Sequence, residues 1–127
     1  MQVEVFCTCK AASFHDDDAL DIRGIYERLE VESPSSVVED FIIALRLQSD
    51  ELEQGTHRLR IAIISPSGKR QITEERGFEL DPDRFPVWIC ALFQIHDSCP
   101  AECGVFRLNL YVDGLMLSAR SLKVVQS

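Results

Sequence analysis

The chain has 127 residues, which is enough to bury a hydrophobic core in one domain without help from a metal or a disulfide. Its 13 Lys and Arg residues against 21 Asp and Glu residues give a net charge of −8, which repels phosphate backbones and anionic lipid surfaces. Nucleic acids and membranes are therefore not expected as partners.

Strand signals begin close to the N-terminus. The run VEVFCTCKA, residues 3–11, places Val3, Val5, Cys7 and Cys9 on one face of a strand, because side chains alternate between the two faces of an extended chain. The apolar character of that face predicts that both cysteines pack in a core as ordinary small hydrophobic residues.

The next two apolar segments fit either a helix or a strand. Two sets of residues recur at helical spacing, the first Ile22, Ile25, Tyr26 and Leu29 and the second Val38, Phe41, Ile42 and Leu45. Ser36 and Glu39 would form a capping box for the second helix, whereas Gly24 costs the first helix about 1 kcal/mol. Alternation over residues 41–48 fits a strand equally well. Pattern alone therefore leaves residues 18–30 and 36–47 open between helix and strand.

The segment HRLRIAIISPSGKRQI predicts a hairpin. Leu59, Ile61 and Ile63 share one face, residues 66–68 break the run, and Ile72 begins the return strand. Further along, the run VWICALFQI, residues 87–95, is apolar on both faces and follows two prolines. That pattern predicts a central strand with Trp88 in the core.

The strongest local signal is Asp113-Gly114, which separates two alternating runs and predicts a two-residue hairpin turn. The turn implies a register in which paired residues share an apolar face, namely Val112 with Leu115, Leu110 with Leu117, Leu108 with Ala119 and Phe106 with Ser121. Strands are expected at about 2–11, 57–65, 70–80, 87–96, 104–112 and 115–125.

Several segments resemble, in order along the chain, a family of small bacterial β-sandwich proteins known only as a domain of unknown function. The segments are DDDALDIRGIYERLEVE, FIIALRL, GTHRLRIAIISPSGK, CGVFRLNLYVDG and LKVV. The resemblance implies strands in both ambiguous segments and brings no catalytic residues. With the strand pattern, it predicts one domain over residues 1–127, an all-β, immunoglobulin-like antiparallel sandwich of about 7–8 strands. An α+β domain with the ambiguous segments helical is the alternative.

Cysteines, histidines and acidic residues supply the candidate metal sites. Residues 16–18 are three consecutive aspartates after His15, and their spacing lacks the Gly and the distal Glu of a calcium loop, so a solvated turn is expected. Zinc could be held by a set drawn from Cys7, Cys9, His15, His96, Cys99 and Cys103, although the spacing is not that of a zinc knuckle. We therefore expect inert thiols, with no metal and no cofactor.

The odd number of cysteines, five in total, fits a reducing compartment. The N-terminus shows no basic stretch followed by an apolar run, and no segment approaches about 18 apolar residues. A cytoplasmic location is therefore predicted.

No hydrolytic or phosphate-binding motif occurs in the sequence, and His57 is expected to pack or to face solvent rather than act as a base. The sequence therefore predicts a non-enzymatic interaction or structural module that binds a protein partner or a second copy of itself. Binding is expected at an acidic loop or at a charged strand edge that includes Glu74 and Glu75. Two alternatives remain, a small metal- or thiol-dependent enzyme using His96, Cys99 and Cys103, and a module that binds a small ligand or glycan at a loop end.

Overall fold

The computed structural model describes residues 1–15, 19–31, 41–49, 55–80, 87–95 and 102–126. Within these ranges all regular structure is β-strand, and there is no helix that is long and apolar enough to cross a membrane. The strands are β1 (Gln2–His15), β2 (Ala19–Tyr26), β3 (Arg28–Val31), β4 (Phe41–Ser49), β5 (Gly55–Ile64), β6 (Arg70–Ile72), β7 (Arg76–Leu80), β8 (Val87–Ile95), β9 (Gly104–Val112) and β10 (Leu115–Gln126).

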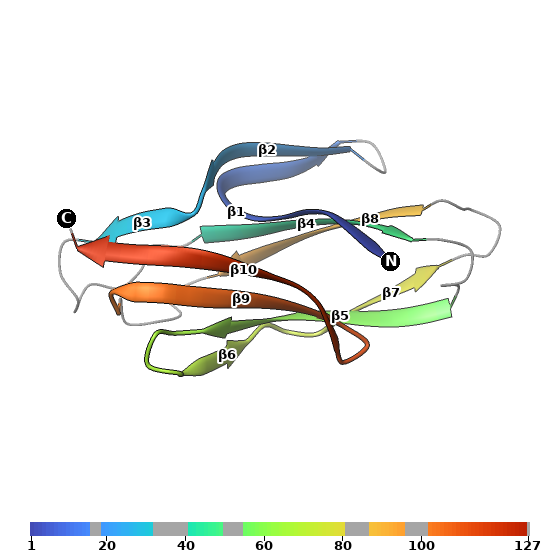
Figure 1. Cartoon of the computed structure of the whole chain (residues 1–127). Helices are drawn as coiled ribbons and strands as arrows, with labels where there is room; N and C mark the ends of the chain where they lie inside the picture. Colours follow the sequence, from blue (N-terminus) through green and yellow to red (C-terminus); the bar gives the residue numbers. More distant parts are fainter. Residues whose placement is uncertain (16–18, 32–40, 50–54, 81–86, 96–101, 127) are drawn as a thin grey trace.

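The strands form two sheets that pack face to face (Figure 1). Sheet A has the order β2-β1-β4-β8, and sheet B has the order β3-β10-β9-β5-β6, with β7 also paired to β5. The cores of these two sheets, β1-β4-β8 and β10-β9-β5, match the A-B-E and G-F-C strands of an immunoglobulin sandwich. All pairs are antiparallel except β3 with β10. The predicted all-β, immunoglobulin-like sandwich is confirmed.

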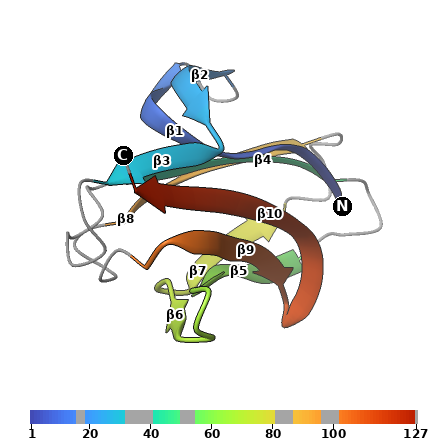
Figure 2. The same ribbon diagram turned by 60° about the vertical axis from the view of Figure 1, so that its left-hand side comes forward.

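The described strands outnumber the seven or eight that the sequence predicts because two expected strands are each divided. Residues 70–80 form β6 and β7, which pair with successive parts of β5. Residues 19–31 form β2 in sheet A and β3 in sheet B, so this part of the chain crosses from one sheet to the other (Figure 2).

The core lies between the two sheets and is filled by alternate residues of the long strands. On β5 the predicted inward residues are almost fully buried, with relative exposures of 2% for Leu59, 0% for Ile61 and 3% for Ile63. The other strands that contribute to the core are β1, β3, β4, β8, β9 and β10, with Phe6, Val31, Phe41, Ile43, Leu45, Leu47, Ala91, Phe93, Ile95, Phe106, Leu108, Leu110, Val112, Leu122 and Val124. Burial of this apolar surface is the main favourable contribution to folding.

The α+β alternative is wrong for the residues that the structure describes. The segment Phe41–Ser49 buries every second residue against sheet B and pairs with β1 and β8 on its two sides, which a helix could not do. Residues 36–40 lie outside the described ranges. Gly24 adopts a positive φ of 66°, a conformation that glycine takes without strain and that a helix interior excludes.

The prediction that β8 is a central strand with Trp88 in the core is wrong, because β8 lies at an edge of sheet A. One face of β8 still faces the core, and the Arg76 guanidinium lies 4.0 Å over the Phe93 ring. Trp88 is half-buried on the opposite face, where Arg46 lies 5.5 Å from its ring and its indole N–H donates to Glu4 over 3.2 Å. These contacts explain how an edge strand can be apolar on both faces.

The turn between β9 and β10 has the predicted conformation, with φ of 53° at Asp113 and 79° at Gly114. Val112 pairs with Leu115 as expected, but a register shift between Met116 and Ser118 changes every later pair by one residue. The other three predicted pairs are therefore wrong, since the observed partners are Leu110 with Ser118, Leu108 with Arg120 and Phe106 with Leu122. The shift turns Leu122 and Val124 inward, and their burial favours it over the unbroken register.

Candidate functional site: a cleft between two strand edges

One side of the sandwich presents two strand edges that lack a neighbour among the described strands. On β1, pairing with β2 begins only at Thr8, so residues 2–7 pair with β4 alone. On β10, pairing with β3 begins only at Lys123, so residues 115–122 pair with β9 alone. The two edges approach one another because β1 and β10 are in contact across the sandwich.

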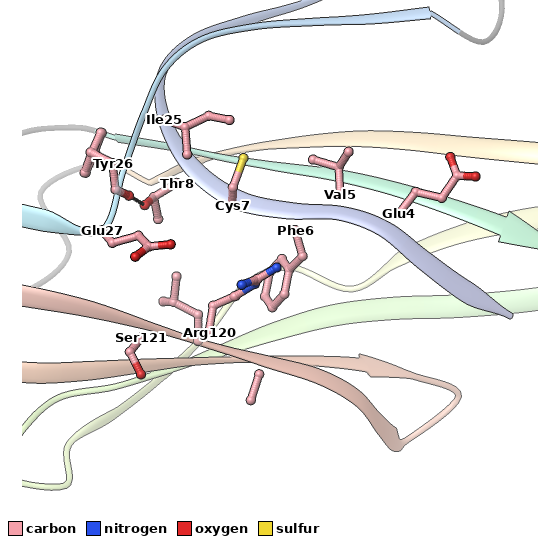
Figure 3. A pocket seen from close by; sticks show the side chains of 12 residues that line it. Glu4, Val5, Phe6, Cys7, Thr8, Ile25, Tyr26, Glu27, Arg120 and Ser121 are labelled. Atoms are coloured by element: carbon pink, nitrogen blue, oxygen red, sulfur yellow. Dashed lines mark hydrogen bonds between the residues drawn. The ribbon is translucent and has the colours of Figure 1, made fainter.

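A cavity of about 560 Å³ lies between these edges, and we call it the edge cleft (Figure 3). Its apolar lining includes Phe6 and Leu108, which are core residues with exposures of 2% and 1%. Charged residues lie around them, and Figure 3 shows the side chains of Glu27 and Arg120 in the space between the two strands. The edge cleft therefore combines an apolar base, strand backbone that has no neighbour among the described strands, and three charged residues, Glu4, Glu27 and Arg120.

Two hydrogen bonds to backbone carbonyls determine where the edge cleft ends. The hydroxyl of Thr8 donates to the carbonyl of Tyr26, and the backbone N–H of Lys123 donates to the carbonyl of Glu27 over 2.9 Å. These bonds hold the chain where it leaves β1 and joins β10, since Tyr26 ends β2 and Glu27 precedes β3. From Thr8 onward β2 pairs with the edge of β1, and from Lys123 onward β3 pairs with the edge of β10. Before these residues, both edges are open toward the cleft.

Of the three charged residues of the edge cleft, Glu4 pairs with Arg46 at 3.1 Å, and the other two are not neutralised by another described residue. Arg120 and Glu27 form no ion pair with each other or with any other part of the described chain. Burial raises the pKa of the Cys7 thiol, the nearby Cys9 raises it further, and the Arg120 charge lowers it by less. The thiol that lines the edge cleft is therefore protonated at neutral pH, and a protonated thiol is a poor nucleophile.

Cys7 and Cys9 share one face as predicted, but Val3 does not share it. A register shift between Val3 and Val5 on β1 places Val3 against the core and turns Val5, Cys7 and Cys9 to the outer face of sheet A. Cys9 is nevertheless fully buried, and burial raises the pKa of its thiol. Cys9 therefore packs as a small apolar residue, as predicted, whereas the prediction for Cys7 is wrong, because Cys7 is half-buried and lines the edge cleft.

The other candidate metal ligands are not brought together among the described residues. Cys103 is exposed just before β9, and His96, Cys99 and the acidic cluster at 16–18 lie outside the described ranges. Within those ranges, no group of three or more His, Cys, Asp and Glu side chains could hold a metal ion. The structure therefore gives no support to a zinc centre that includes Cys103.

Glu74 and Glu75 lie in the connection between β6 and β7 rather than on a strand. Glu75 accepts a hydrogen bond of 3.0 Å from Arg58, while Glu74 is exposed. This connection follows β6, the edge of sheet B opposite the β10–β3 edge. The predicted acidic interaction residues are thus remote in the sheet from the edge cleft.

A histidine and an aspartate form a close pair that sequence reasoning did not find. His57 stacks on Phe78 with ring centroids 5.5 Å apart, and its Nδ1 lies 2.6 Å from the Asp113 carboxylate. The hydrogen bond from His57, followed by that from the Arg58 backbone N–H, lowers the pKa of Asp113. The pair ties the β9–β10 turn to β5, so Asp113 does more than satisfy turn geometry.

A model of a protein family of unknown function, DUF6941, matches residues 4–125. The chain belongs to this family. The family resemblance predicted from its strand motifs is therefore confirmed, and the match leaves only the first three and last two residues of the DUF6941 chain outside it. None of the curated proteins compared with the chain matches it.

Solved structures resemble the DUF6941 chain in fold. Alkylpurine DNA glycosylase AlkC of Pseudomonas fluorescens, bound to DNA containing an abasic site analogue, has a TM-score of 0.60 and 12% identity, with 78% of this chain covered. A β-glucosidase of Listeria innocua in complex with isofagomine has a TM-score of 0.59 and 8% identity, with 97% of this chain covered. The DUF6941 chain spans 28% and 16% of those two chains, and the likeness concerns fold alone.

An immunoglobulin-like protein of Pseudomonas aeruginosa is similar over 92% of the DUF6941 chain and 90% of its own length, with 15% identity and a TM-score of 0.41. The immunoglobulin-like assignment of the fold depends on strand order and not on this match.

Proposed function

We propose that this chain is a non-enzymatic protein-interaction module that binds an extended segment of a partner protein in the edge cleft. The observation that carries the proposal is the pair of strand edges that have no neighbour among the described strands, of which residues 4–7 of β1 and 119–121 of β10 line the cavity. Unpaired edges expose backbone N–H and C=O groups that an extended peptide can use by adding a strand to the sheet.

The lining of the edge cleft supports a peptide as the bound species. Backbone hydrogen bonds from the β1 edge would supply affinity, while Phe6 and Leu108 give an apolar side chain a surface to contact. Glu27 and Arg120, which have no ion-pair partner among the described residues, would add charge selectivity. Binding of this kind requires no chemical step.

The chemistry of the lining supports a binding role over catalysis. Its thiol, Cys7, has a raised pKa, and no histidine is among the residues that line the edge cleft. A small ligand is the competing occupant, because the volume of about 560 Å³ falls in the range of small-molecule sites. Peptide selection, with fragment screening beside it, distinguishes the two occupants.

Peptides selected from a random phage-displayed library against the immobilised protein provide the probe. We expect amide chemical shifts in the selected complex to change along residues 2–7 of β1 and 119–121 of β10. Replacement of Glu27 by Trp should fill the edge cleft and weaken the peptide about tenfold or more. Glu30→Trp is the matched control, because Glu30 is an exposed glutamate on β3 that does not line the cavity. Circular dichroism checks that both variants fold.

The proposal fails if no peptide is selected, or if the shift changes lie on another surface. It also fails if Glu27→Trp and Glu30→Trp weaken binding equally, or if a compound from a fragment library binds the edge cleft while peptides do not. A turnover reaction that Cys7→Ser abolishes would replace the proposal with an enzymatic role.

A further inference from the structure

Several arginines lie on the outer face of sheet B, and three of them form one group. In the register of β5 with β9, the inward residue Ile63 pairs with Leu108, so the next pair, Ile64 with Arg107, faces outward. Arg70 of β6 pairs with the same Ile64 from the other side. Arg107 and Arg70 therefore flank one position from both neighbouring strands.

Tyr111 joins the third arginine to this group. Arg60 pairs with Tyr111 in the register and lies over its ring with a guanidinium-to-centroid distance of 5.1 Å. Arg70 donates a hydrogen bond of 3.2 Å to the Tyr111 hydroxyl. We call Arg60, Arg70, Arg107 and Tyr111 the arginine face. Arg70 and Arg107 are exposed and Arg60 is half-buried.

The charges of the arginine face are not neutralised within the described chain. Other arginines have carboxylate partners, Arg46 with Glu4 at 3.1 Å and Arg58 with Glu75 at 3.0 Å. No carboxylate among the described residues lies within ion-pair distance of Arg60, Arg70 or Arg107. The chain has a net charge of −8, yet these three arginines lie on one sheet face without acidic partners among the described residues. Such a group of positive charges indicates a surface that binds an anion.

We propose that the arginine face binds a carboxylate-rich segment of another protein. Guanidinium groups bind carboxylates with two parallel hydrogen bonds, which gives such a contact both strength and direction. Arg70 and Arg107 lie two strands apart, about 10 Å at the usual strand spacing. Acidic residues at every third position of a polyproline II segment recur at about 9 Å on one side, so a segment with that spacing fits the face.

A nucleic acid is the other polyanion to consider, and the observations favour a peptide. Proteins that bind single strands stack bases on free aromatic side chains. Tyr111 has one arginine over its ring and another on its hydroxyl, which leaves it poorly placed for stacking. The net charge of −8 also repels a long phosphate chain more than a short acidic peptide.

The probe is a fluorescent synthetic peptide with glutamate at every third position, titrated by anisotropy at low salt, with the glutamine version of the same peptide beside it. We expect Arg107→Gln to weaken the glutamate peptide about tenfold. Arg107→Lys should restore only part of the loss, because lysine keeps the charge without the planar fork. The matched control is Arg23→Gln, since Arg23 is an exposed arginine on β2 with no carboxylate partner among the described residues.

Equal weakening by Arg23→Gln would overturn the proposal, because it would indicate a general effect of net charge. Equal binding of the glutamine peptide, or no binding of the glutamate peptide, would overturn it as well. Tighter binding of a single-stranded oligonucleotide of the same charge would assign the face to nucleic acid instead. Glu27→Trp is expected to leave this titration unchanged, so the arginine face and the edge cleft are tested separately.

Discussion

Replacement of Gly104 by Ala tests how β9 is joined to the turn between β5 and β6. Gly104 begins β9 with a φ of 134°, and a Cβ atom at this position would lie 2.9 Å from Cγ and 3.0 Å from Cβ of Pro66. Pro66 cannot move away freely, because its turn is held by a hydrogen bond of 2.9 Å from the Gly68 N–H to the Ser65 carbonyl and another of 2.9 Å from the Ser65 N–H to the Lys69 carbonyl.

Two costs add in the Gly104→Ala variant. A non-glycine residue at this φ is strained by about 1–3 kcal/mol, and the overlap with Pro66 costs about 1–3 kcal/mol more. The free energy of unfolding should therefore fall by about 2–6 kcal/mol. Gly68→Ala is the matched control, since Gly68 has a φ of 90° but no atom lies within 4 Å of the place that an alanine Cβ would take, so only the first cost applies.

Urea unfolding followed by the fluorescence of Trp88 measures both variants, and Pro66→Gly completes a double-mutant cycle. Removing the proline ring should recover about 1–3 kcal/mol of the Gly104→Ala loss, which is the part due to overlap. The reasoning is refuted if Gly104→Ala costs no more than Gly68→Ala, or if the cycle gives no coupling between positions 66 and 104.

Three further predictions concern single side chains. Hydrogen bonds from His57 and from a backbone N–H hold the pKa of Asp113 below its ordinary value of 3.8, so the stability they provide is present above that pH and is lost as the pH falls through the lowered pKa. The wild type should be more stable than Asp113→Asn by up to about 1 kcal/mol near pH 6, and this difference should vanish in acid. A difference in stability that does not depend on pH would contradict this. The Asn109 Oδ1 atom is buried without a hydrogen-bond partner among the described residues, so Asn109→Leu should raise the free energy of unfolding by about 1 kcal/mol in urea titrations; a loss of that size would show that the oxygen is satisfied. Protein purified without chelator should carry well under one zinc per chain by elemental analysis, and Cys99→Ser should leave the melting temperature nearly unchanged; stoichiometric zinc lost in Cys99→Ser or Cys103→Ser would favour the enzymatic alternative.

Local patterns in the sequence determined several elements of the fold. Every second residue from Leu59 to Ile63 is a large apolar residue, and this predicted inward set is buried in β5. The Asp113-Gly114 turn was predicted with its conformation because positive φ at two successive positions is a local requirement that few residue pairs satisfy. Such features follow from interactions between residues that are close in the chain.

The segment that became β4 shows where local pattern was insufficient. A capping box and helical spacing compete there with strand alternation, and only the presence of β1 and β8 on its two sides decides between them. The one-residue shift in the β9–β10 pair has the same origin, because the burial of Leu122 and Val124 against the opposite sheet selects it. Tertiary packing overrides propensity wherever the local energies are nearly equal.

The edge cleft and the arginine face were decided by the tertiary structure alone. The sequence predicted that binding would use a strand edge or an acidic loop, but which edges stay unpaired depends on where β2 and β3 leave their neighbours. Arg60, Arg70 and Arg107 lie on three strands, and their grouping around Tyr111 exists only in the folded register. Side chains far apart in sequence acquire a common role only when strand pairing brings them to one surface, and a pairing of that kind has no local signature.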